Sequence, residues 1–435
     1  MEPSHSPSPT KHPKGLYVLF ASEAWERFSF YSMLSLFTLY LRDGVEGFGW
    51  TETEAITLYS WYLTFVYASP FLGGLLADRY LGYLRTTLIG AVFFVAGHLL
   101  LSFHSITIVY VALVCLVIGN GLFKPNVSTM VGNLYPDGSP LKDRAFVIFY
   151  FGINVGAFVA PVAMELIKQQ AGYHPAFAVA GGGMVVSLAT LYLLRRHVEM
   201  VDAPIAQPAG GQAESGALAS VPESRRIVAL LVIFLIVIVF WMAFHQSGST
   251  LTYFANDNIR SNWSGTIWNA VNPAWILILS FPLVKLWGWL DKRGKEPSTP
   301  AKMSTGMLLT GLSFFVLYVA ATVGEASVTG TDIYDYRVSP FWLIASYGIV
   351  TLGELLLSPM GLSLVSKVAP FRLRGMMMGG WFVATAAGNK LTAIGVYWTR
   401  WPHSVFFAVL GVMCVVVATL LAGLLKPLKK AMPGV

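Results

Sequence analysis

Long apolar runs follow one another along almost the whole chain and are separated by short polar stretches. Each run holds twenty or more residues, the length that an α-helix needs to cross the hydrocarbon core of a bilayer. The pattern predicts an all-α membrane protein with twelve transmembrane helices, at 15–41, 52–77, 84–104, 106–131, 144–168, 175–195, 226–254, 265–290, 303–323, 339–367, 373–399 and 402–425.

Lysines and arginines are concentrated in every second connection, counted from the N-terminus. These connections and the tails carry 20 of them, whereas the intervening loops carry five, namely Arg42, Lys168, Arg260, Arg337 and Arg400. The positive-inside bias therefore places both termini in the cytoplasm and requires an even number of spans. Met1 to Lys14 is polar and Pro-rich, so we expect a tail and not a cleaved signal.

A segment rich in Ala, Gly, Pro and Ser divides the predicted helices into two groups of six. The expected domains are a cytoplasmic tail (1–14), an N-terminal six-helix bundle (15–196), a cytoplasmic linker (197–224), a C-terminal six-helix bundle (225–426) and a second tail (427–435). Two stretches of 18 residues, Gly119–Pro136 and Gly353–Pro370, share Gly, Leu, Pro and Pro at an offset of 234. Two pseudo-symmetric halves are typical of transporters that rock about a mid-membrane site, so we expect alternating access.

Composition excludes several classes of function. Hydrophobic residues make up 55% of the chain and charged residues 12%, which rules out a soluble protein. The net charge of +7 does not indicate nucleic-acid binding, because the basic residues are spread among the loops. Cys115 and Cys414 lie inside apolar runs, and eight scattered histidines argue against a zinc site. We therefore expect no metal and no cofactor.

Charged residues inside the predicted spans are the informative ones, because such groups are costly in a membrane and generally face a cavity. Glu23, Glu26 and Arg27 lie on one face of the first span, and Tyr31 follows one turn later. Two carboxylates beside one guanidinium leave a negative charge uncompensated, which suits a group that exchanges a proton near neutral pH. The alternative is an ion pair between Glu23 and Arg27 that only fixes helix packing.

Later spans also contain charged residues that bear on function. Lys124 is in the fourth span, Glu354 in the tenth and Lys390 in the eleventh. For Lys390 we favour a side chain that extends toward the membrane interface over a functional role.

Short motifs occur in five of the predicted spans, and two further positions extend them. They are EAWERFSFY at 23–31, GLFKPNVS at 121–128, FYFGINVG at 149–156, FHQSGS at 244–249 and GELLLSP at 353–359, with Asn272–Pro273 and Trp381 in addition. Together they resemble the proton-dependent oligopeptide transporter family, a branch of the major facilitator superfamily. The resemblance extends over essentially the whole chain.

The resemblance implies a symporter that takes up di- and tripeptides together with protons and has no catalytic residues. We expect it to be a monomer, and the compact linker and the absence of eukaryotic targeting signals favour a bacterial inner membrane. A site that accepts any short peptide has to read its two ends. Arg27 and Lys124 suit the peptide carboxylate and Glu354 the ammonium group. The other candidate peptide-binding residues are Tyr31, Tyr67, Asn154, Trp241, Asn272, Ser358 and Trp381. The candidate proton-coupling residues are Glu23, Glu26, Arg27, His245 and Glu354.

Our hypothesis for coupling is that Glu23 or Glu26 competes with the peptide carboxylate for Arg27. Protonation of the glutamate frees the arginine for substrate, and substrate release returns the arginine to the carboxylate. Spacing alone does not divide the proton between the two glutamates, which can titrate jointly.

Some positions depart from the family pattern. Phe30 stands where the family usually has the first tyrosine of a pair, and Ser32 stands where glycine is common. His245 occupies a position that is often acidic, so it is either a titrating group in a cavity or a hydrogen-bonded packing residue. The linker of 27 residues from His197 to Glu223 has no room for the two extra helices that many bacterial relatives insert.

Two rival functions have to be weighed. His197 and Asp202 match the HxxxxD spacing of acyltransferases, which would indicate a membrane-embedded enzyme, but they fall in the polar linker. No HExxH or GxSxG pattern occurs, so we expect no enzyme. The closer rival is a facilitator for nitrate, an amine drug or a plant-type metabolite, which would not need the opposite charges of Arg27 and Glu354.

Overall fold

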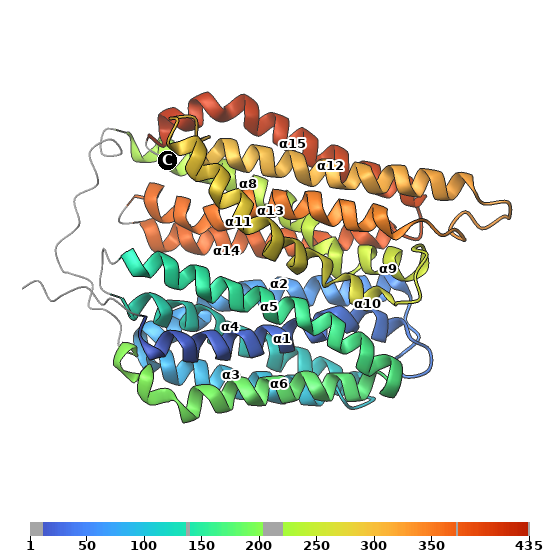
Figure 1. Ribbon diagram of the computed structural model, residues 1–435, viewed down its shortest axis with the longest axis horizontal. Helices are drawn as coiled ribbons and strands as arrows, with labels where there is room; N and C mark the ends of the chain where they lie inside the picture. Colours follow the sequence, from blue (N-terminus) through green and yellow to red (C-terminus); the bar gives the residue numbers. More distant parts are fainter. Residues whose placement is uncertain (1–11, 136–139, 203–220, 371–372, 434–435) are drawn as a thin grey trace, which may run out of the picture. The chain divides into compact units, whose positions relative to one another are not determined.

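The computed structural model describes residues 12–135, 140–202, 221–370 and 373–433, which are mostly helical (Figure 1). The first half of the sequence forms α1 (Lys14–Arg42), α2 (Glu52–Leu76), η1 (Ala77–Leu81), α3 (Tyr83–Leu100), α4 (Ile106–Asn133), α5 (Pro140–Ala171), α6 (Tyr173–Leu193), η2 (Arg195–His197) and η3 (Glu199–Val201). The second half forms α8 (Glu223–Phe244), η4 (His245–Gly248), α9 (Thr250–Asp257), α10 (Gly265–Trp268), α11 (Val271–Asp291), α12 (Thr299–Ala326), α13 (Pro340–Val368), α14 (Arg374–Leu391), η6 (Thr392–Tyr397) and α15 (His403–Ala431). The predicted all-helical fold class is confirmed.

Most of these helices have the composition of membrane spans. Within the described residues, nine helical segments are long and apolar enough to cross a membrane. Helices α1, α2 and α14 are not among the nine. For α1 the reason is plain, because it carries Glu23, Glu26 and Arg27 near its middle. A helix of this kind needs protein around its polar face, because lipid offers no hydrogen-bonding partners.

Three predicted spans are each divided into shorter helical elements. The span at 226–254 divides into α8, η4 and α9, the span at 265–290 into α10 and α11, and the span at 373–399 into α14 and η6. The breaks in the first and last of these meet through Gln246, whose Nε2 donates to the carbonyl oxygens of Met242 at 3.1 Å and Thr392 at 3.2 Å. A side chain from one break thus satisfies a backbone carbonyl at the other.

The chain folds into two compact units. The described residues within Met1–Met33, Ser69–Ala160 and His174–Gln207 form the first unit, and those within Leu34–Ala68, Pro161–Tyr173 and Pro208–Val435 form the second. The second unit therefore contains everything from α8 onward together with most of α2 and the C-terminal ends of α1 and α5. In this unit α12 packs along α15 and α13, and in the first unit α3 packs along α4 (Figure 1).

Close glycine contacts occur at equivalent places in the two units. A Cβ atom at Gly90 of α3 would lie 2.9 Å from the carbonyl oxygen of Gly119 on α4. A Cβ atom at Gly306 of α12 would lie 2.6 Å from the carbonyl oxygen of Gly353 on α13. Small residues allow helices in membranes to approach this closely. Gly119 and Gly353 are the matched glycines of the internal repeat, so the repeat preserves a helix contact.

The start of the predicted linker packs on the first unit. Val198 is fully buried, and the carboxylate Oδ1 of Asp202 accepts a hydrogen bond of 2.5 Å from the backbone N–H of Leu84, in the first turn of α3. Asp202 therefore satisfies a backbone donor at a helix start. This contact accounts for the aspartate of the HxxxxD match without any catalytic role.

Candidate functional site

The three charged side chains of α1 are buried together in the first unit. Glu23 and Glu26 are 1% exposed and Arg27 is 2% exposed. Arg27 donates from Nε to Glu26 Oε2 and from Nη2 to Glu26 Oε1, both at 2.5 Å. Glu23 Oε1 lies 3.6 Å from Arg27 Nε. The sequence neighbours Glu26 and Arg27 therefore form a bidentate ion pair, and Glu23 is the more loosely held carboxylate.

Glu23 differs from Glu26 in a second respect. Its Oε2 atom is buried and accepts no hydrogen bond from the described residues. Lys124 of α4 interacts electrostatically with Glu23, Glu26 and Arg27. We call these four residues the α1–α4 charge cluster. It contains two acids and two bases, so the uncompensated charge expected from α1 alone is balanced by a lysine from another helix.

Two aromatic side chains cover the guanidinium. The Cζ atom of Arg27 lies 4.6 Å from the ring centre of Phe30 and 5.9 Å from that of Tyr31. Both distances fall in the range of cation–π attraction. Phe30 thus contributes to holding Arg27 although it lacks the hydroxyl that the resemblance leads one to expect at this position.

The fifth-span motif brings α5 against α1 beside the charge cluster. A Cβ atom at Gly156 would lie 2.4 Å from the carbonyl oxygen of Ala24 and 3.1 Å from the Cβ of Arg27. Asn154, in the same motif, is 3% exposed and donates from Nδ2 to the carbonyl oxygen of Tyr150 at 2.8 Å. Gly156 therefore sets the distance between the two helices, and Asn154 is fixed by a bond within its own helix.

Glu354 lies in the second unit and is positioned by an amide. Asn272, in the first turn of α11, donates from Nδ2 to Glu354 Oε2 and to Thr351 Oγ1, each at 2.9 Å. Thr351 in turn donates to the carbonyl oxygen of Tyr347 at 2.6 Å. Asn272 and Glu354, two residues expected from sequence to bind substrate, are therefore brought together, and Glu354 remains partly exposed.

Tyr67, Trp241 and His245 form an aromatic group, also in the second unit. The rings of Trp241 and His245 stack at a centroid distance of 5.1 Å and an interplanar angle of 20°. The ring of Tyr67 lies 5.3 Å from His245 and 6.1 Å from Trp241. His245 is 5% exposed and is the first residue of η4, where the seventh span breaks. Tyr67, which is far from the other two in sequence, thus joins Trp241 and His245 in one aromatic cluster.

The contacts of the remaining candidate residues say less about function. Trp381 is 5% exposed and packs edge-on against Phe234 at a centroid distance of 6.3 Å. The side chain of Ser358 lies outside the described residues. Lys390 donates from Nζ to Ser60 Oγ at 3.1 Å and lies 4.2 Å from the ring centre of Trp61. Lys390 therefore contacts α2, and its extension toward the membrane interface stays a prediction.

Two functional candidates were missed in the sequence. Tyr59 is fully buried and donates from its hydroxyl to the carbonyl oxygen of His245 at 3.2 Å. Glu165 is also fully buried and receives several hydrogen bonds near the end of α5. Its charge, inside the predicted span at 144–168, was a signal that could have found it. Nothing in the sequence singled out Tyr59.

Comparison with known proteins identifies the family. The model of the POT family matches residues 84–207 and 212–413. The chain belongs to the POT family. An uncharacterized transporter of Bacillus subtilis (strain 168), YclF, is 31% identical, and the alignment covers 98% of this chain and 96% of that protein. The di-/tripeptide transporter of Lactococcus lactis subsp. lactis (strain IL1403) is 29% identical, with 97% of each chain covered.

A solved structure of a POT-family peptide transporter also resembles this chain. It is a crystal structure of a mutant in complex with alafosfalin, with a TM-score of 0.86, 29% identity, and coverage of 97% of this chain and 96% of that chain. This POT-family chain therefore has the twelve-helix major facilitator fold with two pseudo-symmetric bundles. Its relatives are transporters, so the membrane-embedded enzyme is no longer a competing interpretation.

Proposed function

We propose that this POT-family chain carries di- and tripeptides across a bacterial inner membrane together with protons, by alternating access. The names of the relatives support peptides as substrates. In this proposal the bundles at 15–196 and 225–426 are the moving bodies. The linker at 197–224 and both tails lie in the cytoplasm, and the working form is a monomer.

Recognition of the peptide ends follows from the charges. Arg27 and Lys124 bind the carboxylate, because a planar guanidinium can form two parallel hydrogen bonds and an ammonium adds a point charge. Glu354 binds the peptide ammonium, and Asn272 keeps one of its oxygens oriented. Tyr31, Tyr67, Asn154, Trp241, Ser358 and Trp381 complete the site as we propose it.

The coupling proposal rests on the different hydrogen-bond contacts of Glu23 and Glu26. Glu26 has both oxygens on Arg27, so a proton there would disrupt a bidentate ion pair. Glu23 has one oxygen without a donor among the described residues. We therefore assign the transported proton to Glu23. Protonation changes the charge cluster from neutral to +1, which favours binding of an anionic carboxylate.

Release of the peptide reverses the protonation of Glu23. Once the substrate carboxylate leaves, Arg27 and Lys124 again favour an ionised Glu23, and the proton departs on the same side. About 100 mV and one pH unit supply about 2.3 and 1.4 kcal/mol per proton. These sum to roughly 500-fold accumulation of a neutral solute, since each 1.4 kcal/mol is about a factor of ten. One proton per peptide is therefore sufficient.

Uptake by purified protein in proteoliposomes tests the function. Radiolabelled dialanine should accumulate when the outside is acidic and should be displaced by unlabelled di- and tripeptides. Displacement by nitrate or by a simple amine, with no displacement by peptides, would support the rival facilitator. Accumulation of dialanine that ignores the pH gradient would contradict proton coupling while leaving peptide transport intact.

A further inference from the structure

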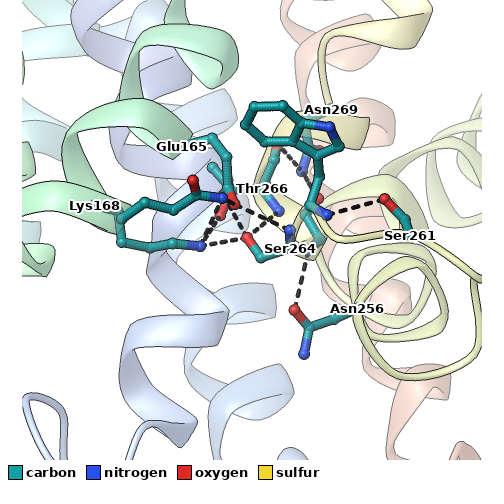
Figure 2. Close-up of polar contacts among 10 residues, drawn as sticks. Glu165, Lys168, Asn256, Ser261, Ser264, Thr266 and Asn269 are labelled. Carbon is teal, nitrogen blue, oxygen red and sulfur yellow. Dashed lines mark hydrogen bonds and ion pairs between the residues drawn. The ribbon is translucent and has the colours of Figure 1, made fainter.

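A buried carboxylate near the end of α5 forms hydrogen bonds with the loop before α10. Glu165 is fully buried, and its Oε1 accepts hydrogen bonds from the backbone N–H of Ser264 at 3.0 Å and from Gln169 Nε2 at 2.8 Å. Its Oε2 pairs with Lys168 Nζ at 2.8 Å and also accepts the hydroxyl of Ser264. Figure 2 shows Glu165 and Lys168 meeting Ser264. The carboxylate is thus fully engaged.

Lys168 completes the contact from the same turn of α5. Its Nζ donates to Ser264 Oγ and, at 3.3 Å, to Thr266 Oγ1 (Figure 2). Ser264 is the N-cap of α10, and its hydroxyl also accepts the backbone N–H of Thr266 at 3.3 Å. A single serine is therefore held by a carboxylate, an ammonium and the first turn of the short helix that it caps.

The receiving loop has a fixed shape of its own. Asn256 Oδ1 accepts the backbone N–H of Gly265 at 3.1 Å, and Asn269 Nδ2 donates to Thr252 Oγ1 at 3.1 Å. A Cβ atom at Gly265 would lie 2.2 Å from the carbonyl oxygen of Thr252, so the loop closes tightly on α9. Glu165 therefore binds a loop whose shape is already fixed. We expect its hydrogen bonds to Ser264 to form and break together.

Other contacts join the same two parts of the sequence inside the second unit. Thr38 donates to the carbonyl oxygen of Gly248 at 3.0 Å, and Arg42 pairs with Asp257 at 3.2 Å. These contacts, like that of Glu165 with Ser264, link α1 or α5 to residues beyond α8. In an alternating-access cycle the parts of α1 and α5 that make these contacts have to separate from the residues beyond α8. This premise rests on the proposed function.

Glu165 is suited to a contact that breaks and forms again. When Ser264 leaves, Lys168 and Gln169 remain on the carboxylate, because both belong to α5 at spacings of three and four residues. The buried charge therefore keeps partners in both states, and only the two bonds to Ser264 are lost. A carboxylate without its own lysine would be left buried and uncompensated, which is far more costly.

We propose that Glu165 and Ser264 form a latch that holds this end of the carrier closed and opens once in each transport cycle. Both are positioning residues, because neither has to touch the peptide. Lys168 is the resident counter-ion that makes the opening reversible.

A removable bridge between the two positions tests the latch. Glu165→Cys and Ser264→Cys are combined in a background with Cys115→Ser and Cys414→Ser, with a protease site in the linker to score joined fragments. A three-carbon bis-methanethiosulfonate should abolish dialanine uptake, and dithiothreitol should restore it. Methyl methanethiosulfonate, which caps the same thiols without joining them, is the matched control and should leave uptake within about twofold of the untreated variant.

The outcomes separate the latch from the transport function. Fragments that stay joined while uptake continues would overturn the latch, because the contact would then stay closed throughout transport. If no dialanine is taken up by the unmodified protein either, the proposed function fails. In that case a second assay, the labelling of a buried cysteine by an impermeant maleimide, still decides on the latch, since labelling needs no substrate.

That assay also applies if the double-cysteine variant does not fold. Ser264→Ala is compared with Thr266→Ala, which removes the 3.3 Å hydrogen bond from Lys168 and leaves Ser264 in place. The reporter is Ser60→Cys at a fully buried position of α2 in the same unit. Ser264→Ala should raise the rate of labelling by an impermeant maleimide about fivefold or more, and Thr266→Ala should not. Equal labelling rates in both variants would count against the latch.

Discussion

The guanidinium of Arg27 binds both oxygens of Glu26, the residue directly before it, whereas Glu23 approaches the same guanidinium only to 3.6 Å. The usual helical expectation is the reverse, because residues four apart face each other and adjacent residues do not. Here the long side chains of neighbours fold back upon each other within a buried site. The arrangement divides two chemically equal carboxylates into one that fixes Arg27 and one that is available for a proton.

Replacement of Glu23 tests that division. Glu23→Gln should remove proton-driven accumulation of dialanine, from several hundred-fold to near equality across the membrane, because no proton can be released. Counterflow between equal peptide pools should persist, since Arg27 and Lys124 remain. Both quantities are measured in proteoliposomes with and without a pH gradient. Full accumulation in this variant would exclude Glu23 as the transported-proton site.

Replacement of Glu26 should act on stability instead. Glu26→Gln leaves a buried guanidinium with a neutral partner, and loss of one member of a buried ion pair typically costs about 3 kcal/mol or more. The melting temperature of the detergent-solubilised protein should therefore fall below that of Glu23→Gln. Equal melting temperatures in the two variants would mean that the ion pair with Arg27 does not hold α1 in place.

The helices were largely predictable because each span is a long apolar run, and this property belongs to the local sequence. The break at His245–Gly248 was not predictable. The polar stretch at 245–250 lies inside an otherwise apolar run, and the contact that accompanies the break is made by Gln246 with Thr392, which is distant in sequence. Tertiary contacts of this kind leave no periodic signal.

The candidate site was predictable to a similar extent. Charges inside apolar spans identified Glu23, Glu26, Arg27, Lys124 and Glu354. Their partners were harder to assign, because Lys124 and Asn272 come from other helices. Spacing along α1 favoured Glu23 as the partner of Arg27, and only the side-chain conformations revealed the bidentate pair with Glu26.

Lys124 should matter for one chemical group of the substrate. Lys124→Ala removes a cation from the proposed carboxylate site, so the KM for dialanine should rise about tenfold, the effect of losing one charge-assisted interaction. An analogue with an amidated C-terminus should compete equally well against the variant and the parent. An equal loss of affinity for both ligands would contradict a role in carboxylate recognition.

Asn272 should matter for the opposite end of the peptide. Asn272→Ala removes the 2.9 Å hydrogen bond that orients Glu354 Oε2. The KM for dialanine should rise about tenfold, as expected for a hydrogen bond to a charged group. N-acetylated dialanine, which has no ammonium, should compete as before. Ser280→Ala is a control on the same helix, since its hydroxyl donates only to the carbonyl oxygen of Ile276 in its own helix.

Gly156 offers a test of the geometry that supports the charge cluster. Gly156→Ala would place a Cβ atom 2.4 Å from the carbonyl oxygen of Ala24, which is backbone and has little freedom to move. The strain should cost about 1–3 kcal/mol and push α1 away from α5 beside Arg27. A lower melting temperature and a reduced dialanine uptake rate should appear together. Gly182→Ala is the matched control, because a Cβ atom there meets no atom within 4 Å. A Gly156→Ala protein as stable and as active as Gly182→Ala would mean that the approach of α5 to α1 does not position the arginine.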